Sequence, residues 1–261
     1  MFYALAEGLI DTEGLVYAHE LQDIETLNQR ALRGELEVSA VSIHAYAYIA
    51  DRYALLSSGA SMGDRYGPRL VARKPSGRAD IKGKRVAIPG LLTSAYLTLR
   101  LYEPEFEAVP TPFDLVEERV LDGSVDMGLI IHEGQLTYAD QGLSLVADLG
   151  EWWHSETGLP LPLGGNVVRK DLGEAIIHKI ARHLHASIAY ALNHRENALN
   201  HAMKYARGLE RRRADEFVGM YVNDWTLDYK EPGRRSVNTL LERGATAGVI
   251  PKLVRPEFVY P

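Results

Sequence analysis

The sequence contains no cysteine, and this absence excludes several kinds of chemistry. No disulfide can crosslink the chain, no thiolate can bind a metal ion, and no cysteine can act as a nucleophile. The chain also lacks a run of about 20 apolar residues, the length that a membrane-spanning helix needs. The N-terminus shows no basic region followed by a long apolar stretch, so we expect no secretory signal, no membrane partner and a cytoplasmic protein.

A basic excess is missing as well. The formal net charge is −6 over 261 residues, and no global positive field argues for a nucleic-acid partner. The one dense basic run, Arg211–Arg213, lies in a helical stretch with acidic neighbours, which is typical of a solvated helix face. The hydrophobic content of 46% is enough for one large domain or for two lobes with cores of their own.

Short apolar runs alternate with amphipathic stretches, a pattern that predicts an α/β protein with largely parallel sheets. After residue 171 the pattern changes to long helices joined by loops. The predicted strands are Leu15–Leu21, Val38–Val41, Leu70–Arg73, Arg85–Ile88, Met127–Ile131, Leu145–Asp148 and Gly165–Arg169. The predicted helices cover residues 1–8, 23–33, 43–52, 93–102, 113–122, 133–139, 151–156, 172–193, 195–207, 210–223 and 233–247.

Two segments predict where the chain crosses between lobes. Residues 74–84 (KPSGRADIKGK) are polar and contain proline and glycine, and residues 159–166 (LPLPLGGN) supply a candidate return crossing. Two crossings give a discontinuous first lobe, residues 1–75 and 162–261, and a continuous second lobe, residues 76–161. This layout suits hinge closure around a ligand in a cleft between the lobes.

Two stretches align without a gap, residues 31–44 (ALRGELEVSAVSIH) and residues 120–133 (VLDGSVDMGLIIHE). Each contains a helix end, a glycine suited to a helix C-cap, an acid, and then an apolar strand followed by polar residues. Ligands bind at the carboxyl ends of the strands in open parallel sheets. We therefore predict that Ser42 and His132 face each other across the cleft.

The histidines of the C-terminal helical region do not have the spacing of metal ligands. His178 and His185 are seven residues apart, as are His194 and His201, and no carboxylate completes an HExxH-type set. We interpret these four, together with His183, as surface residues and predict no metal site.

His132 differs because it directly follows the apolar run GLII. Histidine ordinarily titrates near about pH 6.5, so a partly buried imidazole at a strand end is a workable general base. A histidine that caps the strand and bonds to the backbone explains the same pattern, and spacing alone leaves both interpretations open. Glu133 either orients His132 or begins the next helix, and the favourable meeting of its charge with the helix dipole favours the second role.

The stretch GLLTSAY (90–96) follows the strand RVAIP and opens a helix. Thr93 or Ser94 would cap that helix and leave backbone N–H groups near Ser94 and Ala95 for a carboxylate. An ordinary N-cap accounts for the same residue types without a ligand. Two further segments, SSGASMG (57–63) and LPLPLGG (159–165), also fall at lobe edges and are flexible enough to lie close to a ligand.

Five stretches carry a resemblance to a known family: LQDIETLNQRAL (21–32), VSAVSIHAYAYI (38–49), SGASMGDRYGPRLVAR (58–73), GLIIHEGQLTYADQGL (128–143) and DLGEWWHSETGLPLPLGG (148–165). Together they resemble the 1,4-dihydroxy-6-naphthoate synthases of the futalosine route to menaquinone. The similarity runs over nearly the whole chain, and GLIIHE with DLGEWW and TGLPLPLG is its specific part.

The resemblance implies a fold like that of type II periplasmic binding proteins, with two α/β lobes, a two-segment hinge and a ligand cleft. It implies a cytoplasmic lyase-type enzyme, without a metal or organic cofactor, that converts cyclic dehypoxanthine futalosine to 1,4-dihydroxy-6-naphthoate. The family's proton-removing histidine falls on His132. Its pocket for carboxylate and hydroxyl groups falls on Ser42, Ser94 and Ala95, with Thr93 adjacent.

The sequence departs from that family in two places. Family members begin with a strand and an acid-containing loop before the helix FYAL, so we expect that a first strand is missing before Met1. Arg65 and Arg69 place charge where smaller or apolar residues are expected. Two rival functions share the fold, a non-catalytic solute-binding protein and the chorismate dehydratase of the same pathway, and the GLIIHE and EWW motifs favour the synthase.

Overall fold

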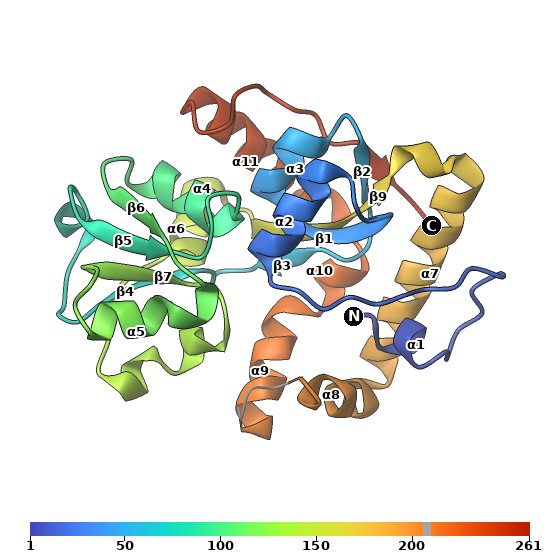
Figure 1. Ribbon diagram of the computed structural model, residues 1–261, viewed down its shortest axis with the longest axis horizontal. Coiled ribbons are helices and arrows are strands. Elements are labelled where there is room, and N and C mark those ends of the chain that lie inside the picture. The colour runs from blue at the N-terminus through green and yellow to red at the C-terminus, as the bar shows by residue number, and fades with distance from the viewer. Residues whose placement is uncertain (206–209) are drawn as a thin grey trace.

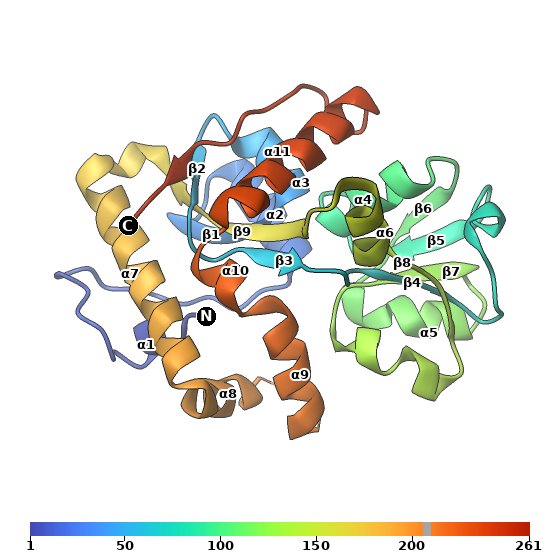
Figure 2. The ribbon, with the colours of Figure 1, turned by 180° about the vertical axis from the view of Figure 1, so that it is seen from behind.

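The computed structural model describes residues 1–205 and 210–261 and contains two β-sheets, each with its own helices. The first sheet has the strand order β1-β9-β2-β10, with β3 paired to the first residues of β9, and the second has the order β6-β5-β7-β4-β8. The two sheets and their helices form two lobes that lie side by side, as Figure 1 and the reverse view in Figure 2 show. The predicted two-lobed α/β fold is confirmed.

The strands of each sheet come from distant parts of the chain. The first sheet contains β1 (Val38–Ser42), β2 (Tyr53–Leu56), β3 (Ser61–Gly63), β9 (Leu161–Arg169) and β10 (Phe258–Val259). The second sheet contains β4 (Arg69–Ala72), β5 (Arg85–Ile88), β6 (Glu107–Pro110), β7 (Met127–Ile130) and β8 (Ser144–Asp148).

The helices follow the same division. Those of the first lobe are α1 (Tyr3–Ala6), α2 (Ile24–Arg33), α3 (Ile43–Ile49), α7 (Glu174–Asn193), α8 (Arg195–Met203), α9 (Arg211–Tyr221), α10 (Asp224–Leu227) and α11 (Lys230–Thr246). Those of the second lobe are α4 (Ser94–Tyr102), α5 (Val116–Leu121) and α6 (Leu149–Thr157). Short 3-10 helices are η1 (Arg78–Asp80), η2 (Phe113–Leu115), η3 (Glu133–Leu136), η4 (Tyr138–Gln141) and η5 (Lys170–Leu172).

The two sheets differ in strand direction. In the second sheet β5 runs parallel to β6 and β7, while β4 is antiparallel to β7 and β8. In the first sheet β9 is antiparallel to β1, β2 and β3, so the prediction of largely parallel sheets is wrong for this lobe. The path of the chain is the reason. Since β9 carries the chain back from the second lobe, Ser42 at the carboxyl end of β1 pairs with Gly164 near the beginning of β9.

The chain passes between the sheets at residues 64–68 and 158–160. Residues 74–84, where the first crossing was expected, instead connect β4 to β5 within the second sheet. The segment containing β4 therefore belongs to the second sheet, because β4 pairs with β7 and β8. The return passage overlaps the beginning of the predicted segment 159–166.

The predicted strand Leu15–Leu21 does not form. Val16 and Leu21 are 96% and 75% exposed, so these apolar side chains cover no sheet face. The predictions also lack β2, β3, β6, β10 and α10, which are short elements of two to four residues. The predicted helix at residues 133–139 is the pair of 3-10 helices η3 and η4.

Successive side chains of a strand point to opposite faces of the sheet, so neighbouring residues of one strand pack into different hydrophobic cores. On β4, Leu70 faces the central core, which includes residues of α4 and α6 and continues into the first lobe, while Val71 faces α5. The far face of the first sheet is covered by α7 (Figure 1).

On β7, a Cβ at Gly128 would lie 2.7 Å from side-chain atoms of Val116 and Val120. This glycine therefore lets α5 pack directly on the strand that leads to His132.

Candidate functional site

Ser42 lies at the carboxyl end of β1, where the chain turns into α3. Its side chain is buried and does not cap α3. Asn28 of α2 holds it instead: Asn28 Oδ1 accepts from the Ser42 N–H at 2.8 Å, and Asn28 Nδ2 donates to Ser42 Oγ at 3.1 Å. Because Oγ accepts from Asn28, the hydroxyl hydrogen of Ser42 is free to donate to a ligand.

Thr93, Ser94 and Ala95 form the N-terminus of α4, shortly after β5. Thr93 is the N-cap, and its Oγ1 accepts from the N–H of Tyr96 at 3.2 Å. Among the described residues, nothing accepts from the backbone N–H groups of Ser94 and Ala95. The positive end of the helix dipole adds to these donors, so this turn suits a carboxylate or hydroxyl oxygen.

His44 joins the two turns across the lobes. Its backbone N–H donates to Ser94 Oγ at 3.2 Å, and its Nδ1 donates to the carbonyl oxygen of Thr93 at 3.3 Å. Burial lowers the pKa of His44 to about 4, although the bond to Thr93 acts in the opposite direction. The buried imidazole of His44 is therefore neutral, and the contacts of this residue hold Ser42 close to residues 93–95.

Glu25 of α2 makes a second bridge to the same loop. Its Oε2 accepts from the backbone N–H of Leu92 at 3.3 Å. At Gly90, where φ is 154°, a Cβ would lie 2.3 Å from that carboxylate oxygen. Glycine is therefore required for this approach. Glu25 and Asn28 were not among the predicted site residues, because no motif distinguishes them from other helical positions. His44 ends the aligned stretch 31–44, but it was not predicted as a site residue either.

His132 directly follows β7 and is the N-cap of η3. Its Nδ1 accepts from the backbone N–H of Gly134 at 3.0 Å. Its Nε2 lies 3.6 Å from Glu117 Oε2, and the side chain is only 14% exposed. The ring meets Phe113 edge-on, with 5.6 Å between the ring centroids. His132 is thus a capping residue, and its catalytic role stays a prediction.

Glu117 of α5 is a buried acid that the sequence patterns did not predict. Its Oε1 accepts from Gln141 Nε2 at 3.0 Å. Burial raises the pKa of Glu117, while the nearby His132 acts to lower it. Glu133 begins η3, in agreement with its predicted role at a helix start, and its carboxylate lies 3.9 Å from His132 Nδ1.

The structure brings most of the predicted residues to one edge of the second sheet. β5 and β7 are parallel neighbours, with Ala87 paired to Gly128, so residues 93–95 and His132 follow strands that end on the same side. Ser42 reaches this edge from the first lobe through the contacts of His44. Over residues 1–205 and 210–261, no hydrogen bond or ring contact joins His132 to Ser42 or Ser94. Their facing each other across a cleft stays a prediction.

Arg69 has a structural role at the start of β4. Its Nε lies 3.2 Å from Asp148 Oδ2, and its Nη1 donates to the backbone carbonyl of Gln135. Its guanidinium also lies over the ring of Tyr138, at 5.7 Å from the centroid. Arg69 therefore ties the beginning of α6 to η3, beside His132. Arg65 is exposed in a left-handed turn, and nothing in the structure explains its charge.

In the described part of the chain, no group of three or more His, Asp or Glu side chains is placed to hold a metal ion. The prediction that His183 lies on the surface is wrong, since this residue is 3% exposed. Tyr17 Oη lies 2.8 Å from its Nδ1 and a Glu13 oxygen lies 3.4 Å from its Nε2, because the N-terminal segment folds over α7. Across the described residues, we find no helix with the length and apolar character needed to cross a membrane.

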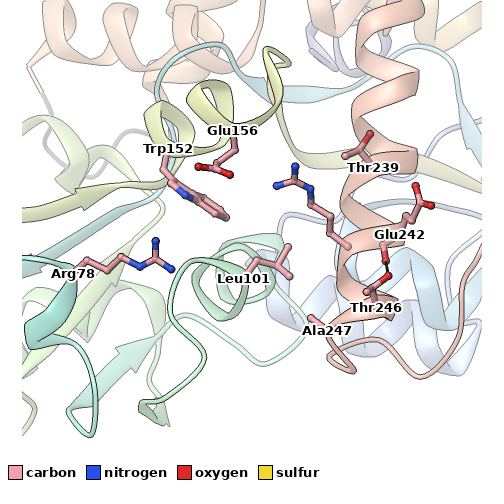
Figure 3. A pocket seen from close by; sticks show the side chains of 9 residues that line it. Arg78, Leu101, Trp152, Glu156, Thr239, Glu242, Thr246 and Ala247 are labelled. Atoms are coloured by element: carbon pink, nitrogen blue, oxygen red, sulfur yellow. Dashed lines mark hydrogen bonds between the residues drawn. The ribbon is translucent and has the colours of Figure 1, made fainter.

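A groove of about 630 Å³ lies between α11 of the first lobe and α4 and α6 of the second. Figure 3 shows the side chains that line it. Leu101 lines it from the last turn of α4, at the opposite end of that helix from Thr93. The groove is therefore separate from the turns that carry the predicted site residues. Its lining consists of Arg78, Leu101, Trp152, Glu156, Thr239, Glu242, Arg243, Thr246 and Ala247.

Comparison with known proteins places these features in a family. A family profile described as menaquinone biosynthesis matches residues 1–246. A curated 1,4-dihydroxy-6-naphthoate synthase of Thermus thermophilus is 41% identical over 259 residues, which cover 99% of this chain and 94% of the relative. The synthase of the same name from Streptomyces coelicolor is 37% identical over 267 residues, covering 100% of this chain and 94% of the relative.

The chain also resembles solved structures. A protein from Archaeoglobus fulgidus has a TM-score of 0.91 and 46% identity, covering 95% of this chain and 93% of that chain. The alkanesulfonate-binding protein SsuA from Xanthomonas axonopodis pv. citri, bound to MOPS, has a TM-score of 0.69 and covers 99% of this chain and 93% of that chain. Its identity is 13%, so this second likeness concerns the fold alone.

The fold and the polar turns at the lobe junction define a two-lobed α/β protein of the periplasmic-binding-protein type. Within this class the chain belongs to the menaquinone biosynthesis family, because the family profile and two relatives of more than 30% identity span nearly all of it.

Proposed function

We propose that the protein is a 1,4-dihydroxy-6-naphthoate synthase, an enzyme of menaquinone biosynthesis. The observation that carries this proposal is its identity of 41% and 37% to two synthases of that name over nearly the whole chain. The substrate is then the small molecule cyclic dehypoxanthine futalosine, and the reaction is a lyase-type elimination that releases the naphthoate. We further propose that the enzyme acts in the cytoplasm and needs no cofactor.

The two facing turns form the substrate-binding part of this proposal. Ser42 donates its hydroxyl hydrogen, and the free N–H groups of Ser94 and Ala95 donate from the end of α4. Thr93 fixes the helix start through its bond to Tyr96. All of these groups donate hydrogen bonds, so they suit the carboxylate and hydroxyl oxygens of the substrate.

His132 is the general base of this proposal. A neutral imidazole removes a proton from a carbon of the carbocycle, and the electron pair left behind drives the elimination and the formation of the aromatic ring. The side chain is 14% exposed, which supports a reaction that proceeds away from bulk water. Exclusion of water keeps a reactive intermediate from being diverted before the product forms.

The two lobes supply the closure that such a site needs. We propose that the lobes follow the sheets, with residues 1–63 and 161–261 in one and residues 69–157 in the other. Residues 64–68 and 158–160 are then the two connecting segments of a hinge. Closure at this hinge brings the donors of Ser42, from the first lobe, onto a substrate that rests on the second.

His132→Ala provides the decisive test. We expect this variant to lose naphthoate formation from cyclic dehypoxanthine futalosine by a factor of about 100 or more, since a general base contributes about 10² to 10⁴ in rate. Substrate affinity, measured by calorimetry, should change little. The product is followed by its fluorescence, and His178→Ala on the exposed face of α7 is the matched control. Full activity of His132→Ala would remove His132 from the mechanism.

A solute-binding protein is the alternative that the fold favours, because SsuA shares it. The two functions differ in one measurement. If the unsubstituted protein binds cyclic dehypoxanthine futalosine but forms no naphthoate over a long incubation, the synthase proposal fails and the binding function takes its place.

A further inference from the structure

The imidazole of His132 is held between two groups of its own lobe. On one side the backbone N–H of Gly134 donates to Nδ1 at 3.0 Å. On the other side the carboxylate of Glu117 lies 3.6 Å from Nε2, which has no hydrogen-bond partner among the described residues. A backbone donor bound to Nδ1 and a carboxylate 3.6 Å from Nε2 thus lie on opposite sides of the ring.

These contacts select one tautomer. Nδ1 accepts a hydrogen from Gly134, so it carries none itself, and the hydrogen of the neutral ring is on Nε2, toward Glu117. Nδ1 is then the atom that can take up a proton. This is the arrangement of an acid and a histidine in a catalytic triad, with the roles of the two ring nitrogens exchanged.

The surroundings of Glu117 keep its carboxylate in place. Its side chain is 11% exposed, and Gln141 of η4 donates to Oε1, so that Oε2 faces the ring. A Cβ at Gly134 would lie 2.5 Å from Glu117 Oε2 and 2.7 Å from His132 Cε1. Any larger residue would therefore separate the two groups. Glu133 of η3 is a further charged group close to them, with 33% of its side chain exposed.

We propose that Glu117 is the positioning residue of the candidate base: its carboxylate, 3.6 Å from Nε2, attracts the Nε2 hydrogen of His132 and stabilises the imidazolium that forms when Nδ1 takes a proton. This inference rests on the proposed role of His132 as general base. In the step itself the proton moves from a substrate carbon to Nδ1, and the bonding electron pair stays on the substrate. Nδ1 gives up the Gly134 hydrogen bond, and the carboxylate of Glu117 compensates the new positive charge.

The first test measures His132 directly and needs no turnover. Nitrogen-15 NMR of histidine-labelled full-length protein reports the tautomer and titration of each imidazole, and His132→Gln assigns the signal. We expect the Nε2–H tautomer at neutral pH. Glu117→Gln should move the NMR titration of the His132 ring to lower pH, because a carboxylate close to the ring favours the charged imidazolium. Glu133→Gln is the matched control and should shift it by less than half as much, because Glu133 is more exposed.

The second test connects this titration to catalysis. The acidic limb of the kcat profile should move to lower pH in Glu117→Gln by the same amount as the NMR titration, and kcat on the plateau should fall by about tenfold or more. KM should stay within about twofold, because Glu117 does not belong to the turns that hold the substrate. Gly134→Ala forces the side chains of Glu117 and His132 apart, so it should move the acidic limb of the kcat profile in the same direction. This variant takes the place of Glu117→Gln if Glu117→Gln does not fold.

The outcomes separate the two proposals. An unsubstituted protein without turnover refutes the synthase proposal, while the NMR titration still decides whether Glu117 holds the ring. If the unsubstituted protein turns over and Glu117→Gln leaves both the titration of His132 and the acidic limb unchanged, Glu117 is not the positioning residue.

Discussion

The side chain of Asn28 determines which hydrogen bond Ser42 can make to a ligand. An asparagine amide presents both a donor and an acceptor, and here both are used on the same serine. Because Oγ already accepts from Nδ2, the hydroxyl hydrogen can donate to a carboxylate or hydroxyl oxygen of the substrate. An aspartate of the same shape would accept that hydrogen instead, and it would bring a negative charge into a buried place.

We therefore expect Asn28→Asp to raise KM for cyclic dehypoxanthine futalosine by about tenfold or more, since an unsatisfied buried polar group costs about 1 to 3 kcal/mol. kcat should change less, because Asn28 does not contact His132. Steady-state kinetics separate the two parameters. Gln29→Glu is the matched control, since it makes the same chemical change at the next position of α2, on an exposed side chain that bonds to Glu25. Equal rises in KM for both variants would contradict the role of Asn28.

The sequence predicted the residues that stand at strand–helix junctions, because junctions leave a local pattern. Thr93 is the N-cap of α4 and Glu133 begins η3, and both follow from turn chemistry within a few positions. Asn28 meets Ser42 from 14 positions away, and Glu25 meets Leu92 from 67 positions away. No local pattern contains such pairings, so the supporting polar groups became visible only in the folded chain.

At the scale of elements, the first turns of α3 and α4 face each other, and His44 is the side chain between them. His44 is 2% exposed, and burial lowers its pKa to about 4. In the unfolded chain it titrates near the ordinary histidine value of about 6.5, so the unfolded state binds more protons between these two pH values. The titration of His44 therefore has no effect on stability well above pH 6.5, and it lowers the free energy of unfolding as the pH falls through this window.

We expect the contribution of His44 to lower the free energy of unfolding by about 2 kcal/mol between about pH 7.5 and about pH 5, at about 1.36 kcal/mol per unit of pKa shift. His44→Gln, which cannot titrate, should show a pH dependence weaker by this amount. Urea unfolding followed by circular dichroism at the two pH values measures it. His178→Gln on α7 should keep the unsubstituted pH dependence, and a His44→Gln protein that also kept it would show that His44 is not buried in its neutral form.

Strand pairing between distant segments was the least predictable part of the fold. β5, β7 and α4 were predicted close to their observed bounds, because apolar runs and a helix cap define them locally. The direction of β9 and the assignment of β4 to the second sheet depend on partners about 55 to 130 positions apart in the chain. Leu15–Leu21 has the composition of a strand but no partner, and it lies across the surface instead.

At the scale of the whole molecule, several contacts hold the two lobes in the observed arrangement. Arg213 of α9 forms an ion pair with Asp140 of η4 at 2.7 Å. Tyr221 of α9 donates to Gln135 Oε1 at 2.7 Å. Gln135 lies in η3, the short helix that His132 caps. These contacts and the bridge of His44 lie on the side of the predicted site, whereas the groove of Figure 3 is at the other end of α4. A relative motion of the lobes would therefore change the width of that groove.

Trp152 is placed to report this motion. It lines the groove from α6 (Figure 3), and its ring meets that of Tyr102 edge-on, with 5.3 Å between the ring centroids. Saturating the His132→Ala variant with cyclic dehypoxanthine futalosine should change its tryptophan emission, because binding without turnover fixes one arrangement of the lobes. Trp152→Phe in the same background should remove the change, whereas Trp225→Phe in α10 should keep it. If calorimetry establishes binding while the emission stays constant, the lobes keep one arrangement, and residues 64–68 and 158–160 do not act as a hinge.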